Sequence, residues 1–201
     1  MSESVTAELP ATRPIAASFP PGHGGLTREQ VSELRSVMNE DRMTQGGIGY
    51  VKGNNFDSRI RSGQVQWIMR NEIDPRIYSH LFTLASVANR ERNWNFEIDG
   101  MAHALQATRY SGEASEHYDW HMDWGGGKLG FRKISAVAHL TEESDFAGGS
   151  LQLTNGSFPV QAAQAAGTVT VFPSFVMHRV TPVTAGCRLA VVAWVLGPSF
   201  R

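Results

Sequence analysis

The stretch from residue 167 to residue 196 reads GTVTVFPSFVMHRVTPVTAGCRLAVVAWVL, and it indicates the fold class. Three runs rich in Val, Thr, Leu and aromatic residues, at 167–172, 176–181 and 188–196, are separated by Pro and Gly. Such runs, bounded by turn-forming residues, are typical of short β-strands. We therefore expect the C-terminal part of the chain to form a sheet.

The same pattern extends upstream to about residue 95. Further runs of this kind lie at 101–110, 117–123, 133–140, 150–154 and 157–161. Eight short strands within about 100 residues, without intervening helices, predict a barrel or a double-sheet jelly roll. The strand–helix alternation of a nucleotide-binding sheet is absent from this pattern.

The N-terminal half has helical signals. Thr27 and Gln30 have the spacing of a capping box, which predicts a helix from about 28 to 40. Asp74 followed by Pro75 predicts the start of a second helix, and the residues from Gln64 to Met69 resemble a strand.

The length of 201 residues suits one domain with a single core. Residues 1–12, rich in Ser, Ala, Thr and Pro, are expected to be a flexible arm. Residues 13–201 would form the domain, with a helical flank at about 13–95 and a jelly-roll core at about 96–201. The expected class is thus mainly β: a double-stranded β-helix (jelly roll) with N-terminal flanking helices.

Composition excludes several classes of partner. The formal net charge is −1 and no dense basic run is present, so we expect binding neither to nucleic acid nor to a membrane. The single cysteine excludes an internal disulfide and suits a reducing compartment. With no apolar leader at the start, a cytoplasmic protein is expected. The oligomeric state is left open, with a homodimer as one option.

His121 and Asp123 are candidate metal ligands. On a strand, residues i and i+2 point to one face, so both side chains can approach one ion. A jelly roll can bring His178 beside them. Two imidazoles and one carboxylate can bind Fe(II) on one face and leave the other positions open. The alternative for His121 and Asp123 is a hydrogen-bonded pair at a strand end.

Arg188 lies on the last predicted strand. By alternation, Ala190, Val192 and Trp194 share its face, while the intervening residues face the other way. A buried arginine needs an anionic partner, since an unpaired buried charge is very costly. A carboxylate bound in bidentate fashion would meet that need, and the small Ala190 would leave room for it.

Four segments carry a family resemblance: RYSGEASEHYDWHMD (109–123), FAGGSLQL (146–153), GTVTVFPSFVMHRVTPVTAGCR (167–188) and WVLGPSFR (194–201). They resemble the Fe(II)- and 2-oxoglutarate-dependent dioxygenases, specifically the PKHD-type members of the prolyl 4-hydroxylase-like branch. The N-terminal segments RIRSGQVQWI (59–68) and WNFEIDG (94–100) are similar in arrangement but less diagnostic.

The resemblance implies roles for individual residues. It assigns His121, Asp123 and His178 to iron and Arg188 to the distal carboxylate of 2-oxoglutarate. Tyr110 matches a tyrosine that lines the co-substrate pocket. His139 stands where relatives often carry a tyrosine that touches the same carboxylate, and an imidazole could donate a hydrogen bond in its place.

The expected reaction couples O2-dependent decarboxylation of 2-oxoglutarate to succinate with hydroxylation of a C–H bond, and ascorbate is a candidate reductant. In halogenating relatives the position of Asp123 lacks a carboxylate, so hydroxylation is favoured here. The substrate would be an amino acid, a peptide or protein side chain, or a small metabolite. Candidate substrate contacts are Trp124, Trp194 and Tyr118, and the segments 44–63 and 124–130 are candidate lids.

Two other functions fit part of the pattern. A non-catalytic, cupin-like metal-binding or sensing barrel would keep the three metal ligands but would not need Arg188. A zinc hydrolase would need a general base beside a metal-bound water, for which Glu116 is the nearby candidate.

Overall fold

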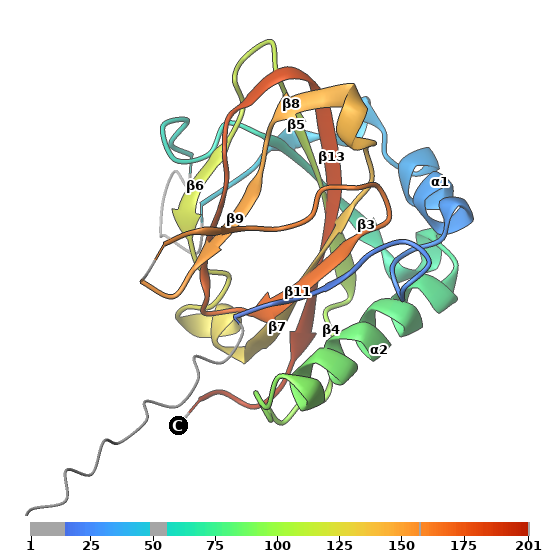
Figure 1. Ribbon diagram of the computed structural model, residues 1–201, viewed down its shortest axis with the longest axis vertical. Helices are drawn as coiled ribbons and strands as arrows, with labels where there is room; N and C mark the ends of the chain where they lie inside the picture. Colours follow the sequence, from blue (N-terminus) through green and yellow to red (C-terminus); the bar gives the residue numbers. More distant parts are fainter. Residues whose placement is uncertain (1–14, 49–55, 157, 201) are drawn as a thin grey trace, which may run out of the picture.

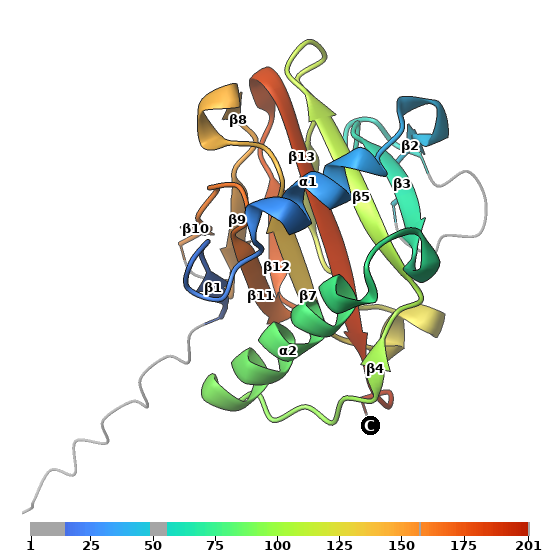
Figure 2. The ribbon, with the colours of Figure 1, turned by 90° about the vertical axis from the view of Figure 1, so that its right-hand side faces the viewer.

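The computed structural model describes residues 15–48, 56–156 and 158–200. The expected arm at 1–12 and residues 49–55 of the candidate lid at 44–63 lie outside these ranges. Two antiparallel sheets face each other, and two helices cover the outer face of the larger sheet (Figures 1 and 2). This arrangement is the expected mainly β jelly roll with N-terminal flanking helices.

The larger sheet has the strand order β1-β11-β7-β13-β5-β3-β2, and β4 and β8 also pair with β13. Its strands are β1 (Ala17–Phe19), β2 (Thr44–Gln45), β3 (Gln64–Met69), β4 (Gly100–Met101), β5 (Ala104–Ser111), β7 (Arg132–His139), β8 (Phe146–Gly148), β11 (Val169–Pro173) and β13 (Val183–Leu196). The smaller sheet has the order β10-β9-β12-β6. Its strands are β6 (Tyr118–His121), β9 (Leu151–Thr154), β10 (Val160–Gln161) and β12 (Met177–Val180).

Helices α1 (Arg28–Ser36) and α2 (Pro75–Glu91) pack on the larger sheet. The capping box of α1 is confirmed: Gln30 N donates to the Thr27 hydroxyl, and Thr27 N donates to the Gln30 side chain. The Asp74 carboxylate caps α2 by accepting from Arg76 N. The described residues also form four short 3-10 helices: η1 (Glu40–Arg42), η2 (Arg70–Glu72), η3 (Gly127–Phe131) and η4 (Glu143–Asp145).

The first predicted helix is shorter than expected. It ends at Ser36 rather than near residue 40, and Asn39 then caps η1 by accepting from Asp41 N. The side chain of Gln66, on β3, accepts from Asn39 N and donates to the carbonyl of Val37. Polar contacts with the sheet thus replace the last helical turn, which local sequence patterns could not reveal.

Strand β13 runs through the middle of the larger sheet and separates two parts of the core. Val191, Ala193 and Val195 pack beneath the helices, while Arg188 and Trp194 line the interior between the sheets. The predicted alternation on this strand is therefore confirmed. The strand begins at Val183 rather than 188 because its first part pairs with β8, which the sequence did not predict.

Among the helices of the described residues, none combines the length and the apolar character needed to cross a membrane.

Candidate metal centre and its cavity

His121 and His178 lie directly opposite each other on neighbouring strands. They are cross-strand partners of β6 and β12 in the smaller sheet, and their ring centroids are 4.1 Å apart. Cross-strand partners of an antiparallel pair project side by side from the same face. The register of two short strands thus brings together two histidines that are 57 positions apart in the chain (178 − 121).

Backbone carbonyls fix the orientation of both imidazoles. Nδ1 of His121 lies 2.7 Å from the carbonyl oxygen of Asp119, and Nδ1 of His178 lies 2.9 Å from that of Val176. A carbonyl can only accept, so each Nδ1 carries the proton and donates. Each neutral ring then has its free lone pair on Nε2, as is usual for metal-binding histidines.

Asp123 completes the group. Its Oδ2 lies 3.7 Å from Nε2 of His178, and the ligand atoms of the three residues all lie within 4.8 Å of one another. Strand β6 ends at His121, so strand alternation does not place this carboxylate as predicted. Instead Asp123 N donates to the carbonyl of Ser174, and the Ser135 hydroxyl donates to Oδ2 over 2.7 Å.

The protonation states of His121 and Asp123 at neutral pH suit cation binding. Burial, reinforced by His178, lowers the pKa of His121 well below its usual value, so this ring is neutral. Burial alone would raise the pKa of Asp123, but His178, His121 and the Ser135 hydroxyl outweigh it and lower that pKa to about 2. A neutral imidazole and an ionised carboxylate are the forms that ligate metals.

Arg188 is a buried cation in the same cavity. Its side chain is 1% exposed, and within the described parts of the chain no carboxylate lies at ion-pair distance from it. Its Nε–H has no hydrogen-bond acceptor there. Burial lowers the pKa of Arg188 to about 10, so the guanidinium remains charged at neutral pH. Such a group is a binding site for an anion.

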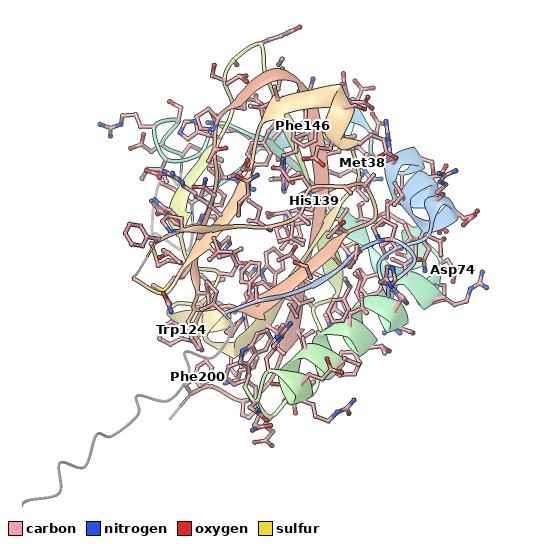
Figure 3. All side chains as sticks on the ribbon, in the orientation of Figure 1. Met38, Asp74, Trp124, His139, Phe146 and Phe200 are labelled. Carbon is pink, nitrogen blue, oxygen red and sulfur yellow. The ribbon has the colours of Figure 1, made fainter. Side chains whose placement is uncertain are left out.

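The cavity between the sheets contains most of the residues singled out from the sequence. Tyr110, Tyr118, Trp194, Arg188 and the three candidate ligands all line it. His139 lies in the interior (Figure 3), behind Arg188 rather than on the cavity wall.

Trp124 is the outlier among these residues. It lies at the lower edge of the molecule near Phe200 (Figure 3), with ring centroids 6.0 Å apart, and lines neither the cavity nor the adjoining cleft. Its expected substrate contact therefore has no support in the structure. Alternation from His121 would itself place Trp124, three residues further on, on the opposite face.

Three polar residues of the cavity were missed in the sequence: Arg61, Gln106 and Thr108. Gln106 and Thr108 share a face of β5 with Tyr110, so alternation could have found them. Arg61 precedes β3 and forms an isolated bridge with Tyr118, and no local pattern indicates that position.

Comparison with protein families supports the resemblance found in the motifs. The model of the 2OG-Fe(II) oxygenase superfamily matches residues 105–196, which include the three candidate ligands and Arg188. Over this range, which is under half of the chain, the sequence is similar to the 2OG-Fe(II) oxygenase superfamily. The resemblance predicted from the motifs is thereby confirmed, and the matched range begins in β5 and ends with β13.

Among curated proteins, this chain is similar to PKHD-type hydroxylases. One from Synechococcus sp. (strain CC9605) is 34% identical over 102 residues, which is 50% of this chain and 45% of the relative. One from Gloeothece citriformis (strain PCC 7424) is 27% identical over 178 residues, covering 85% of this chain and 74% of the relative. The chain thus spans less than half of the first relative's length and about three quarters of the second's.

Solved structures support the fold. A Pseudomonas putida prolyl-4-hydroxylase has a TM-score of 0.70 at 18% identity, covering 92% of this chain and 94% of that one. A Trichoplax adhaerens prolyl hydroxylase, in complex with a hypoxia inducible factor peptide fragment, has a TM-score of 0.73 at 22% identity, covering 92% and 84%. At such identities the similarity is evidence for the jelly roll alone.

Proposed function

We propose that this protein is an Fe(II)- and 2-oxoglutarate-dependent hydroxylase. The observation that carries the proposal is the pairing of a His-Asp-His group with a buried arginine in one cavity. The three ligands would hold Fe(II), and Arg188 would hold the distal carboxylate of 2-oxoglutarate. When bound, the metal and co-substrate supply the activation of O2 that hydroxylates a C–H bond and releases succinate and CO2.

The residues present fit both groups. Two imidazoles and an ionised carboxylate are a donor set that suits divalent iron. The charged side chain of Arg188, without an anion among the described residues, suits a dicarboxylate whose other end lies at the metal. Tyr110, the cross-strand partner of Arg188, lines the same cavity and can donate a phenolic hydrogen bond to that carboxylate.

The protein's own contribution would be position and exclusion of water. Carbonyls of Asp119 and Val176 hold the imidazoles, and Ser135 holds the carboxylate. Phe172, at 4.7 Å from the His178 ring, together with Leu151 and Val137, gives the inner part of the site apolar surroundings. A low-polarity wall strengthens electrostatic contacts to a bound anion.

The substrate class stays part of the proposal. The PKHD-type relatives are named hydroxylases, and the Trichoplax neighbour was solved with a peptide fragment, so amino acids, peptide side chains and small metabolites are the candidate classes. Ascorbate as a reductant, a cytoplasmic location and a homodimer stay predictions. Of the two lid candidates, residues 124–130 lie next to the metal ligands and include most of η3.

The two rival functions are less well supported. A cupin-like binding barrel gives no reason for a buried, unpaired Arg188 in the cavity. For zinc hydrolysis, Glu116 would have to face the metal. Its carboxylate instead accepts from Ser111 N over 2.7 Å, and Glu116 does not line the cavity.

The test is anaerobic spectroscopy. Addition of Fe(II) and 2-oxoglutarate to the metal-free protein should produce a weak visible charge-transfer band, and the band should be absent in Arg188→Ala. Arg179→Ala is a matched control, because Arg179 contacts Gln152 and Trp120 outside the cavity. Iron-loaded wild type without the band would refute the proposal. Succinate release against an amino-acid, peptide and metabolite panel, followed by a product 16 Da heavier, would then identify the substrate.

A further inference from the structure

Arg61 is a second buried cation beside the metal-ligand group. Its side chain is 4% exposed, although it lies just before β3 near the rim of the larger sheet. Nη1 donates to the carbonyl of Gly47 over 3.0 Å, and Nη2 donates to Oε1 of Gln106 over 3.1 Å. The guanidinium carbon lies 4.4 Å from the centroid of the Tyr118 ring. Neutral groups therefore hold Arg61 in place without cancelling its charge.

An acidic partner for Arg61 is missing from the part of the chain that the structure describes. None of the ion pairs there includes this residue. Residues 49–55, which lie outside the described ranges, read GYVKGNN and contain no Asp or Glu. A guanidinium has five N–H donors, and only two are accounted for by Gly47 and Gln106. Arg61 thus keeps donors and a full charge for a ligand.

The position of Arg61 relates it to the substrate rather than to the co-substrate. It lines the inner cavity and also a wider cleft of about 270 Å³ that adjoins it. Arg188 lines the inner cavity alone. Five residues line both spaces: Arg61, Gln106, Tyr118, Asp123 and Trp194. The cleft therefore leads to the metal ligand Asp123, and Arg61 lies at the junction.

Part of the wall of the cleft is apolar and aromatic, beside polar residues such as Thr44, Gln45 and Arg132. Trp67, on β3, lies with its ring centroid 5.9 Å from that of Trp194, and both line the cleft. Phe56 and Met122 are exposed apolar residues of the same cleft. One buried cation next to an aromatic wall, within 270 Å³, suits a ligand of side-chain size with an acidic group and an apolar body.

We propose that Arg61 binds a carboxylate of the substrate, so that the hydroxylated compound is an organic acid whose apolar part lies against Trp67 and Trp194. The inference rests on the proposed function, because the dicarboxylate co-substrate is assigned to Arg188 and the metal. Because both carboxylates of the co-substrate are assigned to Arg188 and the metal, neither one pairs with Arg61. A substrate carboxylate would supply the missing charge and orient the carbon chain toward the metal.

The test compares each acid with its uncharged counterpart. L-Proline, L-leucine and L-lysine would be titrated against their primary amides, and N-acetyl-Gly-Glu-Gly-amide against the corresponding Gln peptide. Binding is followed anaerobically by tryptophan fluorescence. Trp67 and Trp194 line the cleft, so their emission should change when a ligand enters it. A second measurement, made in the presence of air, is the rate of succinate release that each compound stimulates. At least one acid should bind about tenfold or more tightly than its amide.

The free amino acids and the peptides distinguish between two sources of the carboxylate. Preference for a free amino acid over its amide assigns the α-carboxylate of a small molecule. Preference for the Glu peptide over the Gln peptide assigns an acidic side chain. Equal binding of acid and amide in every pair, or no binding of any acid, would overturn the proposal.

Variants of Arg61 supply a second line of evidence. Arg61→Gln should remove the acid-over-amide preference, and Arg61→Lys should retain part of it because the charge persists. The matched control is Arg59→Gln, since the Arg59 side chain is 87% exposed and pairs with Asp57. Retained preference in Arg61→Gln would contradict the proposal. A wild-type protein that shows no band with Fe(II) and 2-oxoglutarate would instead refute the proposed function, which keeps the two failures distinct.

Discussion

Nη2 of Arg188 lies 3.5 Å from Nδ1 of His139, in the interior of the barrel. A guanidinium can only donate, so Nδ1 accepts and the ring proton belongs on Nε2. Burial, together with the charge of Arg188, lowers the pKa of His139 well below its usual value, so the ring is neutral. His139 therefore contacts the guanidinium of Arg188 directly, and its contact with the co-substrate stays a prediction.

Replacement of His139 should weaken co-substrate binding without affecting the metal. In His139→Leu the Arg188 guanidinium loses an acceptor, so we expect the affinity for 2-oxoglutarate to fall about tenfold. The measurement is anaerobic titration of the Fe(II) complex with 2-oxoglutarate. The control is His103→Leu, an exposed histidine that directly precedes β5. An unchanged dissociation constant would show that His139 does not position Arg188.

Gly149 provides the space in which Arg188 lies. A Cβ at this residue would be 2.9 Å from Cδ of Arg188 and 2.9 Å from Cγ2 of Val183, and its φ is +59°. Gly149→Ala should therefore displace the arginine, lower 2-oxoglutarate affinity about tenfold and reduce the free energy of unfolding by about 1–2 kcal/mol.

Gly126→Ala is the matched control for Gly149→Ala. A Cβ at Gly126 meets nothing within 4 Å, and its φ is −70°. Co-substrate titration and denaturant unfolding of the two variants give both quantities. Equal behaviour of the two alanine variants would contradict the assigned role of Gly149.

Ser135 should increase the affinity for Fe(II) through its hydrogen bond to Asp123. Its hydroxyl donates to Oδ2 of Asp123 and lies 3.0 Å from the Ser174 hydroxyl. Hydrogen bonds to metal-ligating carboxylates typically contribute 10- to 100-fold in affinity. We expect Ser135→Ala to weaken Fe(II) binding by about that factor, measured by competition with a chromophoric chelator. The control is Ser144→Ala, a substitution of an exposed serine, which should bind Fe(II) like the wild type. Wild-type affinity in Ser135→Ala would show that the hydroxyl has no effect on the metal.

The metal-free protein should lose stability in acid through Asp123. The pKa of this carboxyl is lowered to about 2 from 3.8, so the folded state favours the ionised form. The associated stabilisation is present above about pH 4 and is lost as the pH falls toward 2.

Asp123→Asn should remove that part of the pH dependence. Urea unfolding of metal-free protein between pH 5 and pH 2 would show a shallower decline in the variant than in wild type. Asp99→Asn, an exposed aspartate, should follow the wild-type curve. Parallel curves for wild type and Asp123→Asn would show that the carboxylate is not stabilised in its ionised form.

Local sequence features predicted much of the fold. The caps at Thr27 and Asp74 depend on residues within a few positions of each other, and the structure confirms both. The inward face of β13 also follows from the two-residue period of a strand. Strand β8 was missed because its three residues, which include Gly148, form a strand only by pairing with the distant start of β13.

By itself, the sequence determined the jelly-roll class, the three candidate metal ligands and the inward direction of Arg188, because strand periodicity and ligand chemistry are properties of short segments. Tertiary structure decided how these parts meet. The pairing of β6 with β12 placed His121 opposite His178, Ser174 and Ser135 positioned Asp123 beyond the end of its strand, and Arg61 became a buried cation. These contacts join residues far apart in the chain, so sheet register and long-range packing decide them.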